Sequence, residues 1–426
     1  MSNDKLWCSG KGQDLLMKKR KMILITDYYP FSTGETFLEN EVPYLAENFD
    51  LIILTSDLES AQTRAVPNGV TIYRIDAKQG YSFWEKCKYT AKFLCTRIGW
   101  QEIFEILATK TKIRTRLLSS LYFFVEAESF LRQVDAVAAL QPEEDTIVYS
   151  YWANYKLLAF VNKKKRAHFK LVSRFHGYDL YNERYQDGRQ PFKNQMDEAL
   201  DAGLFVSEAG YNYYNRRFKV KNPSIHHLFR LGTNTPQCIP EKQQKHRFLL
   251  CSCSNVIPLK RVELIVEALK QLGDYPLRWV HFGDGNKFEA VQRLAMELPE
   301  QVHYELKGRV GNHEVLDFYS KNYVDCFITT SQTEGGCPVS IMEAISYGVP
   351  IVATSVGGIP EMLRETPNIL LPEDPEIALI ADAIKQIYSM TEEKTNEIRQ
   401  CNMERWRSAF SQEQNNNQLI EFLLTI

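Results

Sequence analysis

The sequence predicts an α/β protein with two doubly wound domains that face each other across a cleft. Three observations support this prediction. The chain has 426 residues, which at ~150 residues per domain corresponds to two or three domains. Short apolar runs alternate with helical patterns along its first half. The alternation restarts after a stretch of linker composition, so the second half repeats the architecture.

The first expected element is a buried strand at Met22–Asp27, an apolar run that ends in the turn-forming stretch Tyr28–Gly34. A helix is expected over Glu35–Asn48, where apolar residues recur at helical spacing, and a second strand at Leu51–Thr55. Strand, helix and strand in this order open a parallel sheet. Later apolar runs extend the sheet at Val70–Ile75, Thr146–Tyr149, Phe169–Arg174 and Gly203–Val206.

The region Tyr81–Asp135 is helical in pattern and rich in aromatic residues. Within it, Trp84–Arg116 has eight basic and three acidic residues, a net charge of +5. Apolar residues are interleaved at Trp84, Phe93, Ile98, Trp100, Ile103, Phe104 and Leu107. This composition fits an interfacial helix on an anionic bilayer. It fits equally a helix that packs its aromatic residues on the N-terminal sheet.

Linker composition at Leu228–Lys245 precedes the second set of elements. Strands are expected at Phe248–Ser252, Trp279–Phe282, Val302–Leu306, Cys326–Thr329 and Pro350–Ala353. Helices are expected at Val262–Leu272, Lys287–Leu298, Asn312–Ser320, Ser340–Tyr347 and Ile377–Ser389. The predicted organisation is a tail at 1–20, an N-terminal Rossmann-like domain at 21–227, a linker at 228–246, a C-terminal Rossmann-like domain at 247–405 and a C-terminal helix at 406–426 that packs back toward the N-terminal domain.

Composition argues against several functions and compartments. The net charge is −2, so no overall basic field attracts nucleic acid. The nine cysteines include no CxxC pair, which argues against a disulfide framework and a zinc knuckle and favours a reducing cytoplasm. Apolar windows near the ~18 residues of a membrane span and a signal-peptide pattern are both missing from the sequence.

The stretch Thr333–Glu361 holds the most informative chemistry. Gly335 and Gly336 let the backbone approach a ligand, and Pro338 suits the first position of a helix whose free N–H groups face the loop. Glu343 lies among apolar residues, where a carboxylate needs hydrogen-bond partners that ligand hydroxyls would supply. This pattern indicates an anion or polyol site. Alternatively, Glu334 and Glu343 are solvated or favour the helix N-terminus electrostatically.

This stretch resembles the donor-site signature of family-4 retaining glycosyltransferases of the GT-B fold, the glycosyl transferases group 1, which have two Rossmann-like domains. The matching residues are Glu334, the loop Gly335, Gly336 and Cys337, then Pro338, Val339 and Ser340, Glu343, and the segments GVPIVAT and VGGIPE. The family has two glutamates eight positions apart, whereas here they are nine apart. The resemblance implies that Glu343 holds ribose hydroxyls and that Glu334 and its loop hold the donor sugar.

The resemblance continues upstream in the second domain. Ser254–Leu269 resembles the segment that binds the donor diphosphate: Lys260 matches the family lysine, Asn255 stands where arginine is usual, and Arg261 is a possible substitute. Both cations could instead begin a solvated helix. The turn with Gly283 resembles the family's strand-to-helix turn. Gly308 and Arg309 match a strand end that contributes to the nucleotide base pocket.

Two segments of the first domain also resemble the family. Ser173–Tyr181 resembles its histidine motif, which implies that His176 lies close to the reacting sugar. The alternative is a structural histidine with satisfied hydrogen bonds. Pro30–Val42 resembles the first loop, in which Gly34 approaches the diphosphate and the acceptor. The alternative is an ordinary turn and helix cap.

The resemblance implies an enzyme, a retaining glycosyltransferase that moves a sugar from a nucleotide-diphosphate-sugar donor to a hydroxyl of a glycan or lipid-linked acceptor. It further implies bacterial surface polysaccharide or lipid-linked glycan assembly, in the cytoplasm or peripherally on an anionic inner membrane. No cofactor and no metal are expected, because no D-x-D triplet occurs. Two alternatives remain: a sugar-nucleotide epimerase on the same scaffold and a non-catalytic sugar-nucleotide-binding protein. An oxidoreductase is disfavoured because no GxGxxG follows the first strand.

Overall fold

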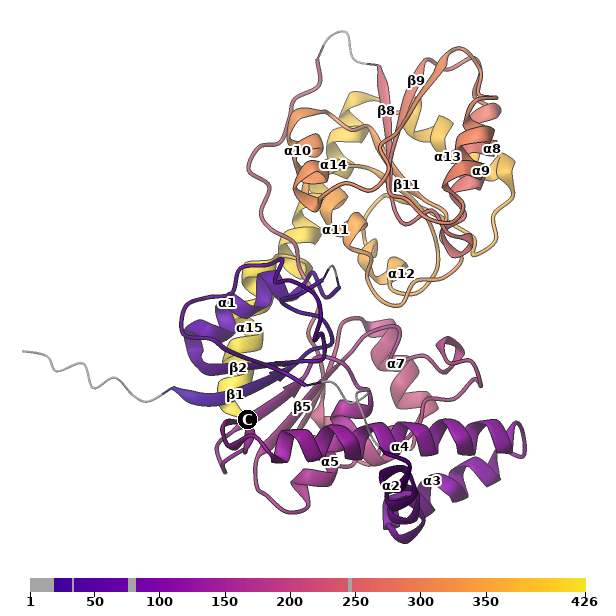
Figure 1. Ribbon diagram of the computed structural model, residues 1–426. Coiled ribbons are helices and arrows are strands. Elements are labelled where there is room, and N and C mark those ends of the chain that lie inside the picture. Colours follow the sequence, from indigo (N-terminus) through magenta and orange to yellow (C-terminus); the bar gives the residue numbers. More distant parts are fainter. Residues whose placement is uncertain (1–18, 33, 76–81, 244–246) are drawn as a thin grey trace, which may run out of the picture.

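The computed structural model describes residues 19–32, 34–75, 82–243 and 247–426. They form two lobes stacked one above the other (Figure 1). The lower, N-terminal lobe has a seven-stranded sheet of order β3-β2-β1-β4-β5-β6-β7, and the upper lobe has a six-stranded sheet of order β10-β9-β8-β11-β12-β13. Among the described residues, every pair of neighbouring strands in the two sheets is parallel. The two doubly wound domains that the sequence predicts are therefore confirmed.

The N-terminal sheet contains every strand expected there and one more. Its strands are β1 (Arg20–Ile25), β2 (Phe49–Thr55), β3 (Thr71–Arg74), β4 (Ile147–Ser150), β5 (Lys170–Phe175), β6 (Ala202–Phe205) and β7 (His226–Leu228). The strand β7 was not expected from the sequence, because three residues that end where the expected linker begins give no measurable alternation. The helices are α1 (Leu38–Asn48), α2 (Phe83–Cys95), α3 (Arg97–Ala108), α4 (Ile113–Asp135), α5 (Tyr155–Lys164), α6 (Lys193–Asp197) and α7 (Glu208–Arg217).

Helix α1 begins three residues later than expected because Glu35 belongs to the preceding loop. Glu35 has a positive φ of 57°. Its buried carboxylate accepts hydrogen bonds from the backbone N–H groups of Asp27, Tyr28 and Tyr29 at 2.7–2.8 Å. An acidic side chain that serves three backbone donors fixes the loop against the end of β1 and cannot start the helix.

The helices α2, α3 and α4 form the end of the N-terminal lobe that is farthest from the upper lobe (Figure 1). Their inner faces meet through aromatic rings, with Phe93 5.5 Å from Phe124 and 6.2 Å from Phe192 between centroids. This part of the aromatic region therefore packs on the N-terminal domain, while other rings of the same helices stay exposed.

The upper lobe also contains every strand that the sequence predicts. Its strands are β8 (Phe248–Cys253), β9 (Leu277–Phe282), β10 (Val302–Leu306), β11 (Cys326–Thr329), β12 (Ile351–Thr354) and β13 (Ile369–Leu371). Its helices are α8 (Val262–Lys270), α9 (Phe288–Ala295), α10 (Asn312–Lys321), α11 (Val339–Ser346), α12 (Ile359–Met362), α13 (Ile377–Tyr388) and α14 (Glu392–Ala409). The short edge strand β13 was not expected from the sequence.

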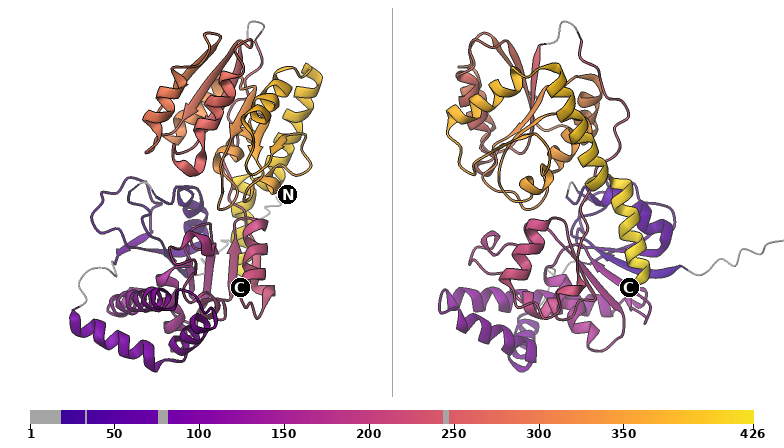
Figure 2. Two further views of the ribbon diagram at one scale, coloured as in Figure 1. Left: turned by 90° about the vertical axis from the view of Figure 1, so that its right-hand side faces the viewer. Right: turned by 180° about the vertical axis from the view of Figure 1, so that it is seen from behind.

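The chain crosses between the lobes twice, at adjacent positions. Thr233 pairs with Ser411 as an isolated β-bridge, and the Thr233 hydroxyl accepts a 2.9 Å hydrogen bond from the indole N–H of Trp406. After the second crossing, α15 (Gln412–Thr425) runs along the lower lobe (Figure 2). Its buried residues Leu419, Ile420 and Leu423 belong to the same core cluster as α1. The C-terminal helix thus completes the core of the N-terminal lobe.

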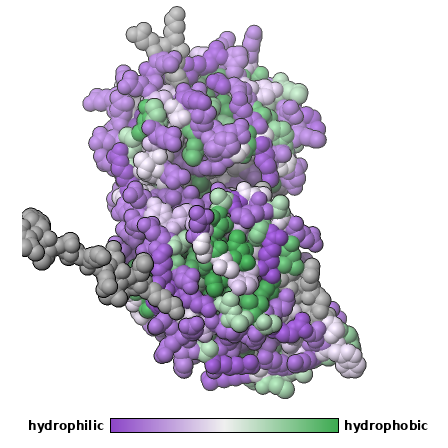
Figure 3. Space-filling model, turned by 60° about the vertical axis from the view of Figure 1, so that its left-hand side comes forward, coloured by the Kyte–Doolittle hydropathy of each residue, from purple (hydrophilic) through white to green (hydrophobic). Residues whose placement is uncertain are grey.

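The surface differs between the lobes. In the view of Figure 3, hydrophilic residues dominate the upper lobe, whereas hydrophobic residues gather on the lower lobe below the waist. Across the described ranges, no helix is long and apolar enough to cross a membrane.

Candidate active site

A cavity of ≈ 640 Å³ lies between the two lobes. Residues of both lobes line it, including Thr36, Trp152 and Val206 from the lower lobe. Twelve of the fifteen predicted site residues also line it: His176, Asn255, Lys260, Gly283, Arg309, Glu334, Gly335, Gly336, Cys337, Pro338, Val339 and Glu343.

Parallel strands explain why residues so far apart in sequence converge here. His176 directly follows β5, and Asn255 and Gly283 follow the ends of β8 and β9. Because parallel strands end at one edge of a sheet, these loops gather at the carboxyl edges, and the two edges face each other. The cavity is therefore built where doubly wound sheets bind ligands.

Glu343 lies on α11 and is 4% exposed. Its Oε1 accepts a 2.6 Å hydrogen bond from the side-chain amide of Asn312, which also lines the cavity. Burial nevertheless raises the pKa of Glu343 from 4.5 to about 7. One amide donor does not compensate a buried carboxylate, so the ionised form gains from any hydroxyl brought to it.

Lys260 and Glu334 form an ion pair on the wall of the cavity. Lys260 ends a short 3-10 turn, Pro258–Lys260, while Glu334 precedes the glycine loop. Their side chains are largely but not fully buried. The pair holds a cation and an anion in fixed positions at the rim of the glycine loop, where each can still meet a ligand.

Glycines let backbone segments pack tightly around this loop, both across to the lower lobe and within the upper lobe. A Cβ added to Gly177 would lie 2.5 Å from the Cα of Gly335. Another added to Gly358 would lie 2.7 Å from the carbonyl oxygen of Gly336. Side chains at these positions would force the backbone segments apart. The loop that carries His176 can therefore lie this close to the glycine loop only with glycine at the contact.

His176 faces the cavity from the N-terminal lobe without a hydrogen-bond partner for its ring. Both ring nitrogens are buried and unpartnered among the described residues. The ring lies 4.4 Å from Trp152 and 4.7 Å from Tyr151 between centroids. Burial, and next the charge of Arg174, hold its pKa well below 6.5. His176 is thus a neutral imidazole with an unused donor and an unused acceptor.

The structure does not bring three predicted residues into the cavity lining. The guanidinium of Arg261 donates to the carbonyl oxygens of Thr330, Ser331 and Glu373 and pairs with Asp374. These bonds fix it as a structural group, so it is not free to replace the missing arginine at Asn255.

The other two residues outside the cavity lining are glycines, Gly308 and Gly34, and both contact residues near the cavity. The carbonyl of Gly308 accepts a 2.9 Å hydrogen bond from the N–H of Gly283 and so supports that turn. Gly34 packs against the ring of Tyr28, while Thr36 and Phe37 of the same loop reach the cavity.

Sequence reasoning missed Trp152 and Asn312, and it placed Glu35 only at the start of the expected helix Glu35–Asn48. The indole N–H of Trp152 donates to Glu35 Oε1 at 2.5 Å, and this ring in turn packs on His176. Trp152 closely follows β4, so its place after a strand was the available signal. Within the part of the chain that is described, no group of three His, Cys, Asp or Glu residues is arranged to hold a metal ion.

Comparisons with known proteins agree with this architecture. Residues 239–402 match the family model described as Glycosyl transferases group 1. The chain is 31% identical over 125 residues to one subunit of the phosphatidylinositol N-acetylglucosaminyltransferase of Arabidopsis thaliana, covering 29% of this chain and 27% of that protein. It is 29% identical over 157 residues to the O-antigen biosynthesis glycosyltransferase WbnH of Escherichia coli, covering 37% and 42%. The chain thus spans less than half the length of these relatives.

Solved structures match over nearly the whole chain. The sucrose-phosphate synthase of Thermosynechococcus elongatus superposes with a TM-score of 0.68 at 14% identity, over 96% of this chain and 99% of that one. The Anabaena protein HepE in complex with UDP gives a TM-score of 0.64 at 14% identity, over 95% and 100%. At this identity the likeness concerns the fold, which is GT-B.

Proposed function

We propose that this chain, a GT-B protein whose residues 239–402 match the group 1 glycosyl transferases, moves a sugar from a nucleotide-diphosphate donor to an acceptor hydroxyl. One observation carries the proposal. A single cavity between the lobes holds the buried carboxylate of Glu343 and the Lys260–Glu334 pair on one wall and the unpartnered imidazole of His176 on the other.

Each group has a task that its surroundings support. Glu343 accepts hydrogen bonds from ribose hydroxyls, which offset the cost of its burial. Lys260 and helix N-termini stabilise the charge that grows on the departing diphosphate. Glu334 holds the donor sugar, and the neutral His176 binds the sugar from the acceptor side.

The donor side is tested by thermal unfolding against a panel of sugar nucleotides. One of them should raise the melting temperature selectively, because a ligand that binds only the folded state stabilises it by mass action. The shift should vanish in Glu343→Gln and remain in Glu300→Gln, which changes an exposed glutamate. If no nucleotide sugar stabilises the wild type, the proposed function is wrong.

The reaction is proposed to retain the anomeric configuration of the donor and to need no divalent cation. Product analysis by NMR coupling constants, with an acceptor present, should show the donor's configuration in the new glycosidic bond. A chelator in excess should leave the rate unchanged. An inverted product, or activity that only manganese restores, would contradict this part of the proposal. Conversion of the donor without an acceptor would instead indicate an epimerase.

The acceptor is proposed to be a growing surface polysaccharide or a lipid-linked glycan. The support comes from relatives named as an O-antigen biosynthesis glycosyltransferase and as a subunit of a phosphatidylinositol N-acetylglucosaminyltransferase. It also comes from exposed rings on α2 and α3: Trp84 is 78% and Phe104 64% exposed. Phe93 and Ile98 of the same segment are buried, so these helices pack on the domain with one face and offer aromatic rings with another. We infer that this outer face contacts an anionic membrane.

Vesicle flotation tests the membrane contact. The wild type should float with anionic vesicles at low salt and much less at high salt, because roughly 1 kcal/mol per basic residue near an anionic leaflet is screened by ions. Trp84→Ser with Phe104→Ser should lose flotation, whereas Met296→Ser, a change at another exposed apolar residue in the upper lobe, should keep it. A wild type that stays soluble at low salt refutes the contact and leaves the transferase proposal intact.

A further inference from the structure

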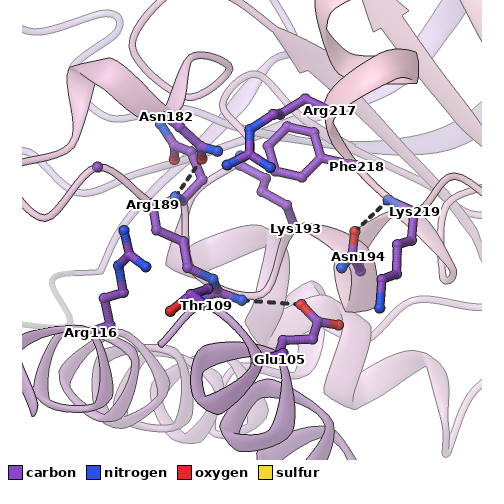
Figure 4. Close-up of a pocket in the computed structure, with 13 residues that line it drawn as sticks. Glu105, Thr109, Arg116, Asn182, Arg189, Lys193, Asn194, Arg217, Phe218 and Lys219 are labelled. Atoms are coloured by element: carbon purple, nitrogen blue, oxygen red, sulfur yellow. Dashed lines mark hydrogen bonds and ion pairs between the residues drawn. The ribbon is translucent and has the colours of Figure 1, made fainter. Parts of the chain in front are cut away.

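A second cavity, of ≈ 230 Å³, lies within the N-terminal lobe and shares no lining residue with the interdomain cavity. Its walls come from α3, the start of α4, the loop 182–190, α6 and the end of α7 (Figure 4). Charge distinguishes it: five of its lining residues are basic and one is acidic. The basic residues are Arg116, Arg189, Lys193, Arg217 and Lys219, and the acidic one is Glu105.

Two of the five cations are engaged by the protein. Arg189 is paired with the buried Glu102 and, at 3.1 Å, with Glu105. Lys193 is 2% exposed and donates to the carbonyl oxygen of Ala153 at 2.7 Å. With Glu102 and Glu105 counted against the five cations, this cluster still has a net charge of +3.

The other three cations have no carboxylate within ion-pair distance in the described ranges. Arg116 donates only to the carbonyl of Asp187 and to the hydroxyl of Thr111. No hydrogen bond or ion pair of the Arg217 and Lys219 side chains occurs among the described residues. Figure 4 shows Arg116 on the left of the cavity, Lys219 on the right and Arg217 above. Three cations that converge on one hollow repel one another, and an anion placed between them relieves that repulsion.

The chemistry of these groups favours a phosphate. Two guanidinium groups present planar forks that suit phosphate oxygens, and a lysine ammonium adds a third donor. A phosphate also needs neutral donors around it, and Asn182 supplies a side-chain amide in the lining. The hollow is large enough for one phosphate with an attached group and much smaller than the donor cavity.

The wall of this cavity is joined directly to the wall that carries His176. Gln190 donates to the carbonyl oxygens of Tyr178 and Tyr181, at 2.8 and 3.1 Å, in the loop that follows His176. Lys193 reaches the carbonyl of Ala153, the neighbour of Trp152. The exposed Phe104 and Leu107 of α3 directly adjoin the lining residues Glu105 and Ala108. The cavity therefore lies between the exposed aromatic face and the acceptor side of the cleft.

We propose that this cavity binds a phosphate group carried by the acceptor, with Arg116, Arg217 and Lys219 as its cationic ligands. The assignment to the acceptor rests on the proposed glycosyl transfer. The phosphate site itself does not. The phosphate belongs either to a lipid phosphate or to a soluble phosphorylated glycan, and both present the same oxygens to these three side chains.

Calorimetric titration with inorganic phosphate tests the site. Wild type and Lys260→Ala, which removes the donor-site cation, should bind phosphate with similar affinity. Arg217→Ala with Lys219→Ala should bind at least tenfold more weakly. The matched control Arg216→Ala with Lys221→Ala removes two charges from the same segment outside the lining and should bind like wild type. All altered side chains except Lys260 are exposed, and circular dichroism checks that each variant is folded. Absence of phosphate binding, or equal binding by the two double variants, overturns the proposal.

Flotation then identifies the source of the phosphate. Phosphatidylcholine vesicles that carry phosphatidic acid are compared with vesicles of equal charge that carry phosphatidylglycerol. A preference of wild type and control for phosphatidic acid, lost in the Arg217/Lys219 variant, supports a lipid phosphate. Phosphate binding without that preference supports a soluble phosphorylated acceptor. If no sugar nucleotide raises the melting temperature but phosphate binds normally, the proposed glycosyl transfer is wrong and the phosphate site remains supported.

Discussion

Glu343 has opposite effects on the stability of the empty protein and on ligand binding. Its pKa is about 7 in the folded chain against 4.5 ordinarily, and the cause is burial. The folded state thus holds this proton more tightly than the unfolded state does. The stability that the proton contributes is complete below pH 4.5 and is lost as the pH rises through about 7. The loss amounts to about 3 kcal/mol above that pH.

Glu343→Gln should therefore stabilise the free protein at pH 8.5 by about 2 kcal/mol or more and change little at pH 4.5. Urea unfolding at the two pH values measures this difference, and Glu300→Gln, at an exposed position, is the matched control. Donor affinity should move the other way. In the wild type it should rise as the pH increases through 7, because the ionised carboxylate is the better acceptor. In Glu343→Gln it should be weak at every pH.

A substitution at His176 should also affect activity and stability differently. His176→Phe keeps a ring against Trp152 but removes two buried polar atoms that have no partner among the described residues. The free energy of unfolding should stay equal or increase by up to ~1 kcal/mol, because buried polar atoms without partners are costly. The catalytic efficiency should fall by about 100-fold, the loss of one strong hydrogen bond. A fully active variant would show that the ring nitrogens do not touch substrate. His303→Phe, at an exposed position, is the control.

The local sequence predicted the burial and the strand-end position of site residues, but not their contacts with distant residues. The apolar neighbours of Glu343 predicted its burial, and the place of His176 after an apolar run predicted a strand end. Asn312 and Trp152 were not predicted, because their partners are 31 residues away at Glu343 and 117 away at Glu35. Such contacts follow from how sheets assemble and leave no local pattern. The contacts of Arg261 were not predicted for the same reason, since its carbonyl partners follow the distant strands β11 and β13.

At the scale of elements, the contact between the loop after β5 and the glycine loop before α11 sets how closely the lobes approach. Gly177→Ala should push the two backbones apart, because the added Cβ would lie 2.5 Å from the Cα of Gly335. The catalytic efficiency should drop at least tenfold, while the melting temperature changes by no more than a few degrees. Gly273→Ala, whose added Cβ meets Pro299 at an ordinary 3.4 Å, should leave both quantities unchanged. Equal activity of the two variants would contradict a tight closed cleft.

Strands were the elements most visible in the sequence. Strands buried on both faces appear as continuous apolar runs, so those of β1, β2 and β8 were found directly. The edge strands β7 and β13 have three residues each, which is too short for a periodic signal. The start of α1 was misplaced because Glu35 accepts hydrogen bonds from backbone N–H groups upstream of it. In the sequence alone, an acidic residue at this position looks like the first turn of a helix.

At the scale of the whole molecule, α15 makes the stability of the N-terminal lobe depend on the last residues of the chain. Leu423 is fully buried against the core of that lobe. Leu423→Ala should lower the free energy of unfolding by about 3 kcal/mol, within the range for buried leucines. Leu424→Ala, at a half-exposed neighbour, should change it by less than ~0.5 kcal/mol. Denaturant unfolding of both variants measures the difference, and equal values would mean that α15 does not dock in solution.

The paired crossings make the upper lobe an insertion within the lower one, with both its ends at one point. The N–H of Thr233 donates to the carbonyl of Phe410 at 3.0 Å, and that of Gln412 to the carbonyl of Thr233 at 3.1 Å. A gene segment for residues 234–410 is therefore a self-contained module with adjacent termini. Such a module can be exchanged for its counterpart from another GT-B protein, or circularly permuted, without dividing either hydrophobic core. A chimera joined only at the first crossing would instead take its C-terminal helix from the other protein. The N-terminal lobe would then lack α15, and its hydrophobic core would be incomplete.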